Sequence, residues 1–245
     1  MSDSISIMVN GAFGKMGALA VATLSENPKF NVIAKLGRHD DLTQQIQRVE
    51  PDVILDLTLA DCVKDNCDIY LTHSSRFVIG ASGLTAQDIE HIQSKCAARK
   101  QGAIIVPNFS IGAVLCMDFA QKAAKWFDGV DIIEMHHHLK KDAPSGTARH
   151  TANLIHQAKH DWPFMNQTPQ QGRETFIDGI PVHSVRMPGI LAMQQVMFGQ
   201  FGETFTISHQ TIDRQAYMPG IQLACLEVMK LDHLVCGLNS LLNSN

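Results

Sequence analysis

Three adjacent histidines and a nearby lysine lie in residues 134–148, EMHHHLKKDAPSGTA. If the first seven of these residues are extended, His136, His138 and Lys140 point to one side of the strand. His137 then points to the other side. A histidine can supply a proton near neutral pH, and a lysine supplies a fixed positive charge. The segment therefore predicts proton transfer beside a bound anion.

A polar loop entering a predicted helix follows this stretch. There Ser145, Gly146 and Thr147 would offer successive backbone N–H groups and two hydroxyls, an arrangement that seats a carboxylate or a phosphate. The alternatives are a metal site, a solvated His/Lys edge, and a nucleophilic Ser145. Neighbouring histidines point to opposite faces, no Cys, Asp or Glu cluster at metal spacing accompanies them, and the Gly-x-Ser-x-Gly pattern is absent. We therefore expect an anion site without a metal.

A second chemical motif, IMVNGAFGKMG, occupies residues 7–17. A buried strand runs into Gly11, Gly14 and Gly17, and a helix follows. Gly11 would permit the sharp turn, and Gly14 would let the backbone approach a pyrophosphate. Gly17 would let the helix sit close to the strand. A purely structural strand–helix turn is the alternative, but the position at the start of a series of such units favours dinucleotide binding.

The end of the second strand carries the residues that read the ribose. An acid is typical there in NAD-binding proteins, whereas this chain has Gly37 and Arg38, with Asp40 close by. Arg38 could hold a 2′-phosphate, which favours NADP over NAD. The alternative is a solvated surface arginine.

Two further polar turns follow buried strands, at residues 79–83 (IGASG) and 106–110 (VPNFS). Both would lie at the carboxyl ends of parallel strands, where open α/β sheets bind their ligands. Asn108 could pair with a carboxamide. Ordinary polar loops are the alternative.

The elements that position these motifs alternate in the first half of the chain. We predict strands at 5–9, 30–34, 53–57, 77–80 and 104–106, and helices at 14–24, 44–48, 60–72 and 85–98, the last with Thr85 as N-cap. Alternation of this kind predicts an α/β fold, a Rossmann-like parallel sheet with right-handed crossovers.

The pattern changes after Pro107. We predict a helix at 111–127, an extended segment at 130–138, a helix after Ser145, a loop at 159–179, strands at 182–187, 195–199 and 204–209, and a last helix at 220–231. Successive strands with short turns favour a second α+β domain with a mixed or antiparallel sheet. The expected domains are 1–109, binding the dinucleotide, and 110–216, for substrate binding and oligomerisation. Residues 217–245 would pack back on the first.

Composition and charge argue against some classes of protein. Of the 245 residues, 45% are hydrophobic, and 20 Lys and Arg against 24 Asp and Glu give a net charge of −4. This argues against a protein that coats nucleic acid. No apolar run approaches the roughly 18 residues of a membrane span, and Met1–Ser6 has no signal pattern, so we expect a cytoplasmic protein. The six cysteines form no CxxC pair and are expected to be reduced, buried thiols.

Seven segments together resemble the 4-hydroxy-tetrahydrodipicolinate reductase family, in the family's order. They are 11–17 (GAFGKMG), 56–58 (DLT), 80–83 (GASG), 107–112 (PNFSIG), 134–148, 183–189 (HSVRMPG) and 201–209 (FGE…SH). The resemblance implies an enzyme of diaminopimelate and lysine biosynthesis, commonly a homotetramer. Hydride passes from NAD(P)H to C4 of a small dicarboxylate ring, and a hydroxyl is lost as water.

The resemblance also implies roles for individual residues. His136 would be the proton donor and acceptor and Lys140 the second catalytic group, with His137, Gly146 and Thr147 on the substrate carboxylates. The cofactor would be lined by Gly11, Ala12, Phe13, Gly14, Lys15, Met16, Gly80, Ala81, Ser82, Val106, Pro107, Asn108 and Phe109. The chain departs from the family at Gly37–Arg38, in a short span between the second and third strands, and at Gln194, where the family often has histidine.

Two other functions remain as hypotheses. One is another two-domain NAD(P)-dependent dehydrogenase of amino-acid metabolism. The other is a nucleotide-sensing Rossmann protein without turnover, which would be indifferent to the loss of His136 or Lys140.

Overall fold

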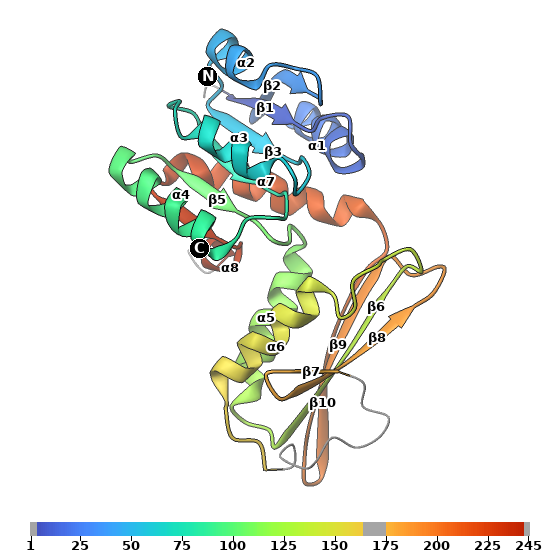
Figure 1. Cartoon of the computed structure of the whole chain (residues 1–245). Coiled ribbons are helices and arrows are strands. Elements are labelled where there is room, and N and C mark those ends of the chain that lie inside the picture. The colour runs from blue at the N-terminus through green and yellow to red at the C-terminus, as the bar shows by residue number, and fades with distance from the viewer. Residues whose placement is uncertain (1–3, 164–174, 243–245) are drawn as a thin grey trace. The chain divides into compact units, whose positions relative to one another are not determined.

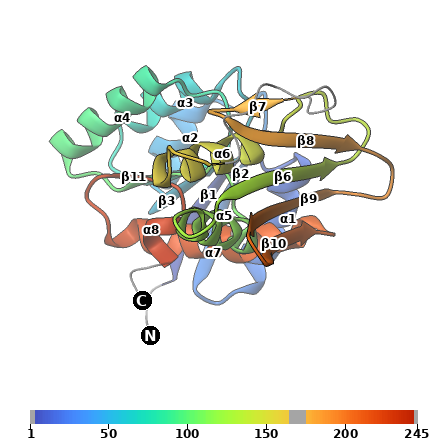
Figure 2. The same cartoon turned by 90° about the horizontal axis from the view of Figure 1, so that it is seen from below.

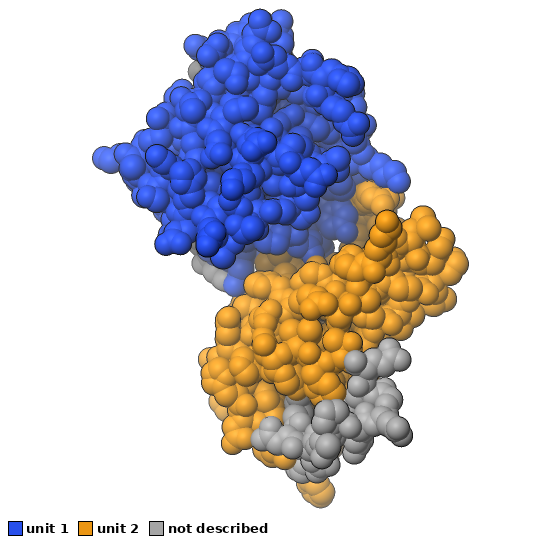
Figure 3. All heavy atoms as spheres, viewed as in Figure 1, with its two compact units in different colours: residues 1–110, 217–245 blue, residues 111–216 orange. Residues whose placement is uncertain are grey.

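The structure is a computed structural model that describes residues 4–163 and 175–242. The chain divides into two compact units (Figure 3). Each unit has its own sheet. Unit 1 contains residues 1–110 and 217–245, and unit 2 contains residues 111–216. In the described parts of the chain, no helix has both the length and the apolar character that crossing a lipid bilayer requires.

Unit 1 is built on a sheet of six strands that all run parallel, in the order β11-β5-β4-β3-β1-β2 (Figure 1). The strands are β1 (Ile5–Asn10), β2 (Phe30–Leu36), β3 (Val53–Asp56), β4 (Arg76–Ile79), β5 (Ala103–Ile105) and β11 (Leu234–Cys236). This confirms the predicted Rossmann-like sheet. Because the strand order reverses at β1, a ligand crevice is expected at the carboxyl ends of β1 and β3.

Helices cover both faces of this sheet (Figure 1). They are α1 (Lys15–Glu26), α2 (Leu42–Val49), α3 (Val63–Tyr70), α4 (Ala86–Arg99), α7 (Met218–Glu227), which continues into the 3₁₀ turn η2 (Val228–Lys230), and the short α8 (Asn239–Leu242). Helices α2, α3 and α4 share one core with the sheet, and α1 contacts α7. The α4 boundary is set as predicted: Thr85 accepts from the Asp88 N–H, and the Asp88 carboxylate accepts from the Thr85 N–H.

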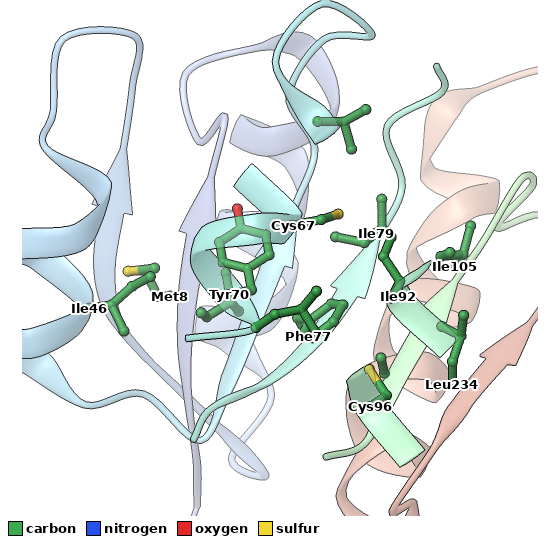
Figure 4. Close-up of a cluster of buried hydrophobic side chains, with 14 of the residues drawn as sticks. Met8, Ile46, Cys67, Tyr70, Phe77, Ile79, Ile92, Cys96, Ile105 and Leu234 are labelled. Carbon is green, nitrogen blue, oxygen red and sulfur yellow. The ribbon is translucent and has the colours of Figure 1, made fainter. Parts of the chain in front are cut away.

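The core between the sheet and α2–α4 is continuous and apolar. Met8, Phe77 and Ile79 on the strands meet Ile46 and Cys67 on the helices (Figure 4). Residues on the opposite face of the same strands are equally buried, so each strand is apolar on both sides, as a covered parallel sheet requires. The sheet edges where strands end are therefore the places left for polar chemistry.

Unit 2 has a five-stranded sheet in the order β10-β9-β6-β8-β7. The strands are β6 (Gly129–His136), β7 (Phe176–Ile177), β8 (Ile180–Arg186), β9 (Ala192–Gln200) and β10 (Glu203–Thr211). Only the β6–β8 pair is parallel, so the sheet is mixed, as predicted. Helices α5 (Ile111–Ala124) and α6 (Gly146–Ala158) lie side by side against one of its faces (Figures 1 and 2). The 3₁₀ turn η1 (Arg214–Tyr217) leads from the end of unit 2 into the last segment of unit 1.

Five details differ from the sequence-based expectations. Cys236 is exposed and Cys62 is half-buried, although all six cysteines were expected to be buried. Strand β6 ends at His136, not at residue 138, and α5 ends at Ala124. The predicted loop 159–179 contains β7, although its residues 164–174 lie outside the described residues. The three residues of β11 carried no strand pattern long enough to be recognised, yet they complete the sheet beside β5.

We predict that Gly17→Ala destabilises unit 1, because the added Cβ would lie 2.0 Å from the carbonyl oxygen of Gly11. Relieving that clash moves α1 away from β1, at a cost of about 1–3 kcal/mol. Gly14→Ala is the matched control, since its Cβ would lie 3.4 Å from the same oxygen. Urea unfolding followed by circular dichroism measures both. Equal stabilities of the two variants would contradict the close packing assigned to Gly17.

Candidate active site

The turn after β1 is fixed by backbone contacts that only glycine allows. Gly11 has a φ of +80°, and a Cβ there would lie 2.7 Å from the carbonyl oxygen of Leu57 after β3. The N–H groups of Gly11 and Ala12 both donate to the Leu36 carbonyl oxygen at the end of β2. The turn is thus anchored to both strands beside β1.

The start of α1 suits a pyrophosphate. Gly14 is the N-cap of α1 and has no side chain with which to cap it, and Lys15 and Met16 form the first turn. The first N–H groups of a helix have no partners within the helix and carry partial positive charge. A dinucleotide phosphate therefore fits this end of α1.

Beneath this turn lies a buried polar network that the sequence analysis missed. The Asp56 carboxylate, fully buried at the end of β3, accepts from the Tyr70 hydroxyl at 2.7 Å and from the Thr58 N–H at 2.8 Å. Asn10 Nδ2 donates to the same Tyr70 oxygen at 2.8 Å. Burial and the charge of Asp56 hold the pKa of Tyr70 well above its usual value. The network joins the ends of β1 and β3, the two strands that flank the expected crevice.

The end of β2 leaves Arg38 exposed. The neighbouring acid, Asp40, accepts a hydrogen bond from the Gly37 N–H at 2.7 Å. No ion pair joins Arg38 to a carboxylate within residues 4–163 and 175–242. A Cβ on Gly37 would lie 2.8 Å from Cδ2 of Phe13, so the Phe13 ring covers this position. Phe13 and Arg38 therefore come from two turns that meet at one edge.

The turns after β4 and β5 also meet. A Cβ on Gly80 would lie 2.5 Å from Cε2 of Phe109. Asn108 Oδ1 accepts from the Ser110 N–H at 2.9 Å, which shapes the second turn. The structure thus brings the turns of all five predicted strands to one edge of the sheet. The remaining predicted cofactor residues, Ala81, Ser82, Val106 and Pro107, belong to these last two turns.

In unit 2 the predicted catalytic histidine is held by a buried carboxylate. Glu134, fully buried on β6, places Oε2 2.6 Å from Nδ1 of His136. Its Oε1 accepts from Nη2 of Arg186 at 2.7 Å and from the Ser145 N–H at 3.3 Å. Glu134 and His136 lie two residues apart on one strand, so their side chains share a face. Burial alone would raise the pKa of Glu134, but the hydrogen bonds from His136 and Arg186 outweigh it and lower that pKa to about 2.

Lys140 is positioned by the loop after β6 and not, as predicted, by the strand itself. Because β6 ends at His136, Lys140 does not lie on the strand, and the expected alternation of His136, His138 and Lys140 is wrong. Instead the Lys140 N–H closes a turn onto the His137 carbonyl oxygen at 3.1 Å. The Lys140 ammonium contacts the Asp142 carboxylate at 2.8 Å, and Arg186 donates to the backbone oxygen of Asp142. The folded-back loop, rather than strand geometry, positions the lysine.

The proposed anion seat at the start of α6 does not include the Ser145 N–H, which the sequence analysis had assigned to it. The Ser145 N–H donates to Glu134, and its hydroxyl oxygen accepts from the Ala148 N–H at 3.2 Å. Ser145 is thus buried as the N-cap of α6, so its N–H is not offered to a ligand as predicted. The exposed Gly146 and the half-buried Thr147 form the first turn, and a Cβ on Gly146 would meet nothing within 4 Å.

Two further residues support this end of α6. Thr151 Oγ1 donates to the Thr147 carbonyl oxygen at 2.8 Å, and the buried Gln194 donates from Nε2 to Thr151 Oγ1 at 2.9 Å. Gln194 also faces Glu134 in the β6–β9 register. Gln194 therefore ties the sheet to α6.

His137 follows β6 and is half-buried. Desolvation lowers the pKa of His137, and the nearby positive charges, including Arg214, lower it further. Within the described residues, no three His, Cys, Asp or Glu side chains are grouped so that they could hold a metal ion.

These features define a class: a Rossmann-type dinucleotide fold joined to a unit with a histidine–carboxylate pair beside an anion seat. The family model for the N-terminus of dihydrodipicolinate reductase matches residues 5–109, and that for its C-terminus matches residues 112–242. The chain belongs to the dihydrodipicolinate reductase family.

Individual members of this family are similar to the chain over nearly its full length. The chain is 47% identical over 240 residues to the 4-hydroxy-tetrahydrodipicolinate reductase of Legionella pneumophila, covering 96% of this chain and 98% of that protein. It is 44% identical over 242 residues to that of Coxiella burnetii, covering 98% and 100%. A dipicolinate-bound dihydrodipicolinate reductase from Paenisporosarcina sp. TG-14 matches with a TM-score of 0.86 and 37% identity, covering 97% and 99%.

The low pKa of Glu134 predicts a pH-dependent contribution to stability. Since its folded-state pKa lies near 2, below the ordinary 4.5, ionised Glu134 stabilises the fold above that ordinary value. The stabilisation is lost as the pH falls from about 4.5 towards 2. We expect wild type to exceed Glu134→Gln in unfolding free energy by roughly 3 kcal/mol near neutral pH and by progressively less in acid. Urea unfolding at several pH values measures the difference, and a constant difference would contradict the assignment.

Proposed function

We propose that this chain reduces 4-hydroxy-tetrahydrodipicolinate to tetrahydrodipicolinate with NAD(P)H, with loss of water, in the diaminopimelate and lysine pathway. The observation that carries the proposal is the His136–Glu134–Arg186 cluster beside the exposed start of α6. It supplies a proton donor and an anion seat in one place, which a dicarboxylate ring accepting a hydride requires.

The residues of unit 2 would divide the chemistry as follows. His136 donates a proton to the reduced ring, and Lys140 opposes the negative charge that develops as hydride arrives. Gly146 and Thr147 bind a substrate carboxylate with N–H groups at the positive end of α6, and His137 donates to a carboxylate from its ring. Ser145 holds the seat in shape through its bonds to Glu134 and Ala148.

The residues of unit 1 would hold the cofactor. A nicotinamide cofactor supplies the hydride, and the protein supplies its orientation. The uncapped start of α1 at Gly14 takes the pyrophosphate, and Asn108 lies in a turn that could meet the carboxamide. Arg38 would contact the 2′-phosphate, so we propose a preference for NADPH over NADH.

The first experiment tests the reaction and the cofactor together. Pyruvate and aspartate semialdehyde are condensed enzymatically, and oxidation of NADPH and of NADH by the purified chain is followed by absorbance. We expect substrate-dependent oxidation, and we expect Arg38→Ala to raise the KM for NADPH about tenfold while leaving that for NADH unchanged, because one charge-assisted contact is lost. No oxidation with either cofactor would overturn the function. Equal effects on both cofactors would overturn only the role of Arg38.

The second prediction concerns the catalytic pair. His136→Ala and Lys140→Ala should each lower kcat by roughly two to four powers of ten, because an acid–base group or a fixed cation is lost. Cofactor affinity, measured by nucleotide fluorescence, should barely change, since the cofactor residues belong to unit 1. His138→Ala, which changes an exposed histidine two residues after His136, is the matched control. Wild-type rates in His136→Ala would instead favour a nucleotide sensor.

We also propose that the chain forms a homotetramer in the cytoplasm, where nicotinamide cofactors circulate. The number four comes from the family resemblance. Support for association comes from the sheet face of unit 2 opposite α5 and α6, where strand alternation places half-buried apolar side chains: Ile133, Met135, Val185, Met193 and Met197. An apolar sheet face of this kind is typical of subunit contacts.

A further inference from the structure

Glu134 is a buried charged group for which neither the sequence motifs nor the proposed reaction assigns a task. It lies on β6, directly beneath the proposed proton donor, and accepts from three elements: His136 on its own strand, Arg186 on β8 and the start of α6. A purely structural acid could be satisfied by Arg186 and the Ser145 N–H alone. The 2.6 Å contact with Nδ1 of His136 helps to stabilise the ionised carboxylate and also constrains the histidine ring.

That contact fixes which ring nitrogen carries hydrogen. Glu134 is ionised at neutral pH, and an ionised carboxylate can only accept hydrogen bonds. Nδ1 of His136 must therefore be the donor, and the neutral ring carries its hydrogen on Nδ1. The opposite nitrogen, Nε2, is left as the atom where a second proton is gained and lost.

We propose that Glu134 is a positioning residue that holds His136 in the Nδ1–H tautomer, so that Nε2 is the atom that donates the proton in the reduction. The inference rests on the proposed function, in which His136 is the acid. In the step, the Nε2–H bond of the imidazolium breaks and its electron pair stays on Nε2. The proton bonds to the anionic ring that hydride addition has produced. Glu134 remains ionised throughout and offsets the charge of the imidazolium before the transfer.

The other charged and titratable groups around the pair come from several elements. They are Arg186 on β8, His137, Lys140 and Asp142 in the loop after β6, Arg149 on α6, and Arg214 on η1. Arg186 is shared between Glu134 and the backbone oxygen of Asp142, so the arginine orients the carboxylate. Arg186 donates to Glu134 Oε1, which leaves Oε2 for the histidine.

The arrangement makes Glu134→Gln an informative variant. Two donors, Arg186 and the Ser145 N–H, meet at the position of Oε1, so the amide oxygen of glutamine would take that place. The amide NH₂ would then face Nδ1 of His136 and donate to it. A ring that accepts at Nδ1 carries its hydrogen on Nε2, the reverse tautomer, and cannot become an imidazolium without placing two donors face to face.

The test is ¹⁵N NMR of the full-length chain with labelled histidine, combined with steady-state kinetics. The His136 signals are identified by their loss in His136→Gln. We expect neutral His136 to carry hydrogen on Nδ1 in wild type and on Nε2 in Glu134→Gln. We also expect kcat to fall about 100-fold or more, with KM and nucleotide affinity within about twofold of wild type. Glu134→Asp, which keeps a carboxylate, should restore the wild-type tautomer and part of the rate.

The matched control is Asp88→Asn, which removes a carboxylate with a pKa near 2 from the helix cap of α4 in unit 1. It should leave the tautomer and kcat unchanged. Hydrogen on Nε2 in neutral wild-type His136 would overturn the proposal, even if Glu134→Gln failed to fold. An unchanged tautomer in a folded Glu134→Gln would also overturn it. Failure of the proposed function would appear separately, as wild-type protein that does not oxidise NAD(P)H with substrate.

Discussion

One ionised carboxylate organises the chemically active end of unit 2. Glu134 accepts from β6, β8 and the start of α6, so it joins three elements, one of which lies 52 residues further along the chain. A buried charge is costly unless strong hydrogen bonds satisfy it, and here the donors are an arginine, an imidazole and a helix N–H. The requirement to satisfy Glu134 thus fixes the start of α6, where we propose the anion seat, and the histidine beside it.

In unit 1 the candidate site is shaped by close approach of the backbone rather than by a buried charge. The strands β1, β3, β4 and β5 carry buried apolar residues on both faces, so polar side chains of these strands gather where the strands end. At that edge the backbone comes too close for any side chain larger than hydrogen at Gly11 and Gly17, which brings the turn and α1 within reach of a phosphate. The Asp56–Tyr70–Asn10 network then ties this turn to the neighbouring strand.

The features that could be predicted from the sequence are those that depend on a local pattern of residues. The parallel sheet followed from alternating strands and helices, and Thr85 was recognisable as a cap because both members of its capping box lie three residues apart. Contacts between residues that are far apart in the sequence could not be predicted from it. Glu134 has no local signal of burial, since its partner Arg186 lies 52 residues away. The position of Lys140 was misjudged because nothing in 134–140 marks where β6 stops, which is decided by a turn onto His137.

The connectivity of unit 1 has a consequence for biosynthesis. Its last stretch is part of the same core: β11 pairs with β5, and a Cβ on Gly220 would lie 2.0 Å from the carbonyl oxygen of Phe109. A chain emerging from the ribosome has made unit 2 completely before these residues appear. Unit 2 can therefore fold first, before β11 and α7 are available to complete the core of unit 1. During this interval the apolar surface of the first-made segment, residues 1–110, would stay incompletely covered. That segment is therefore the part of the chain on which a chaperone would act.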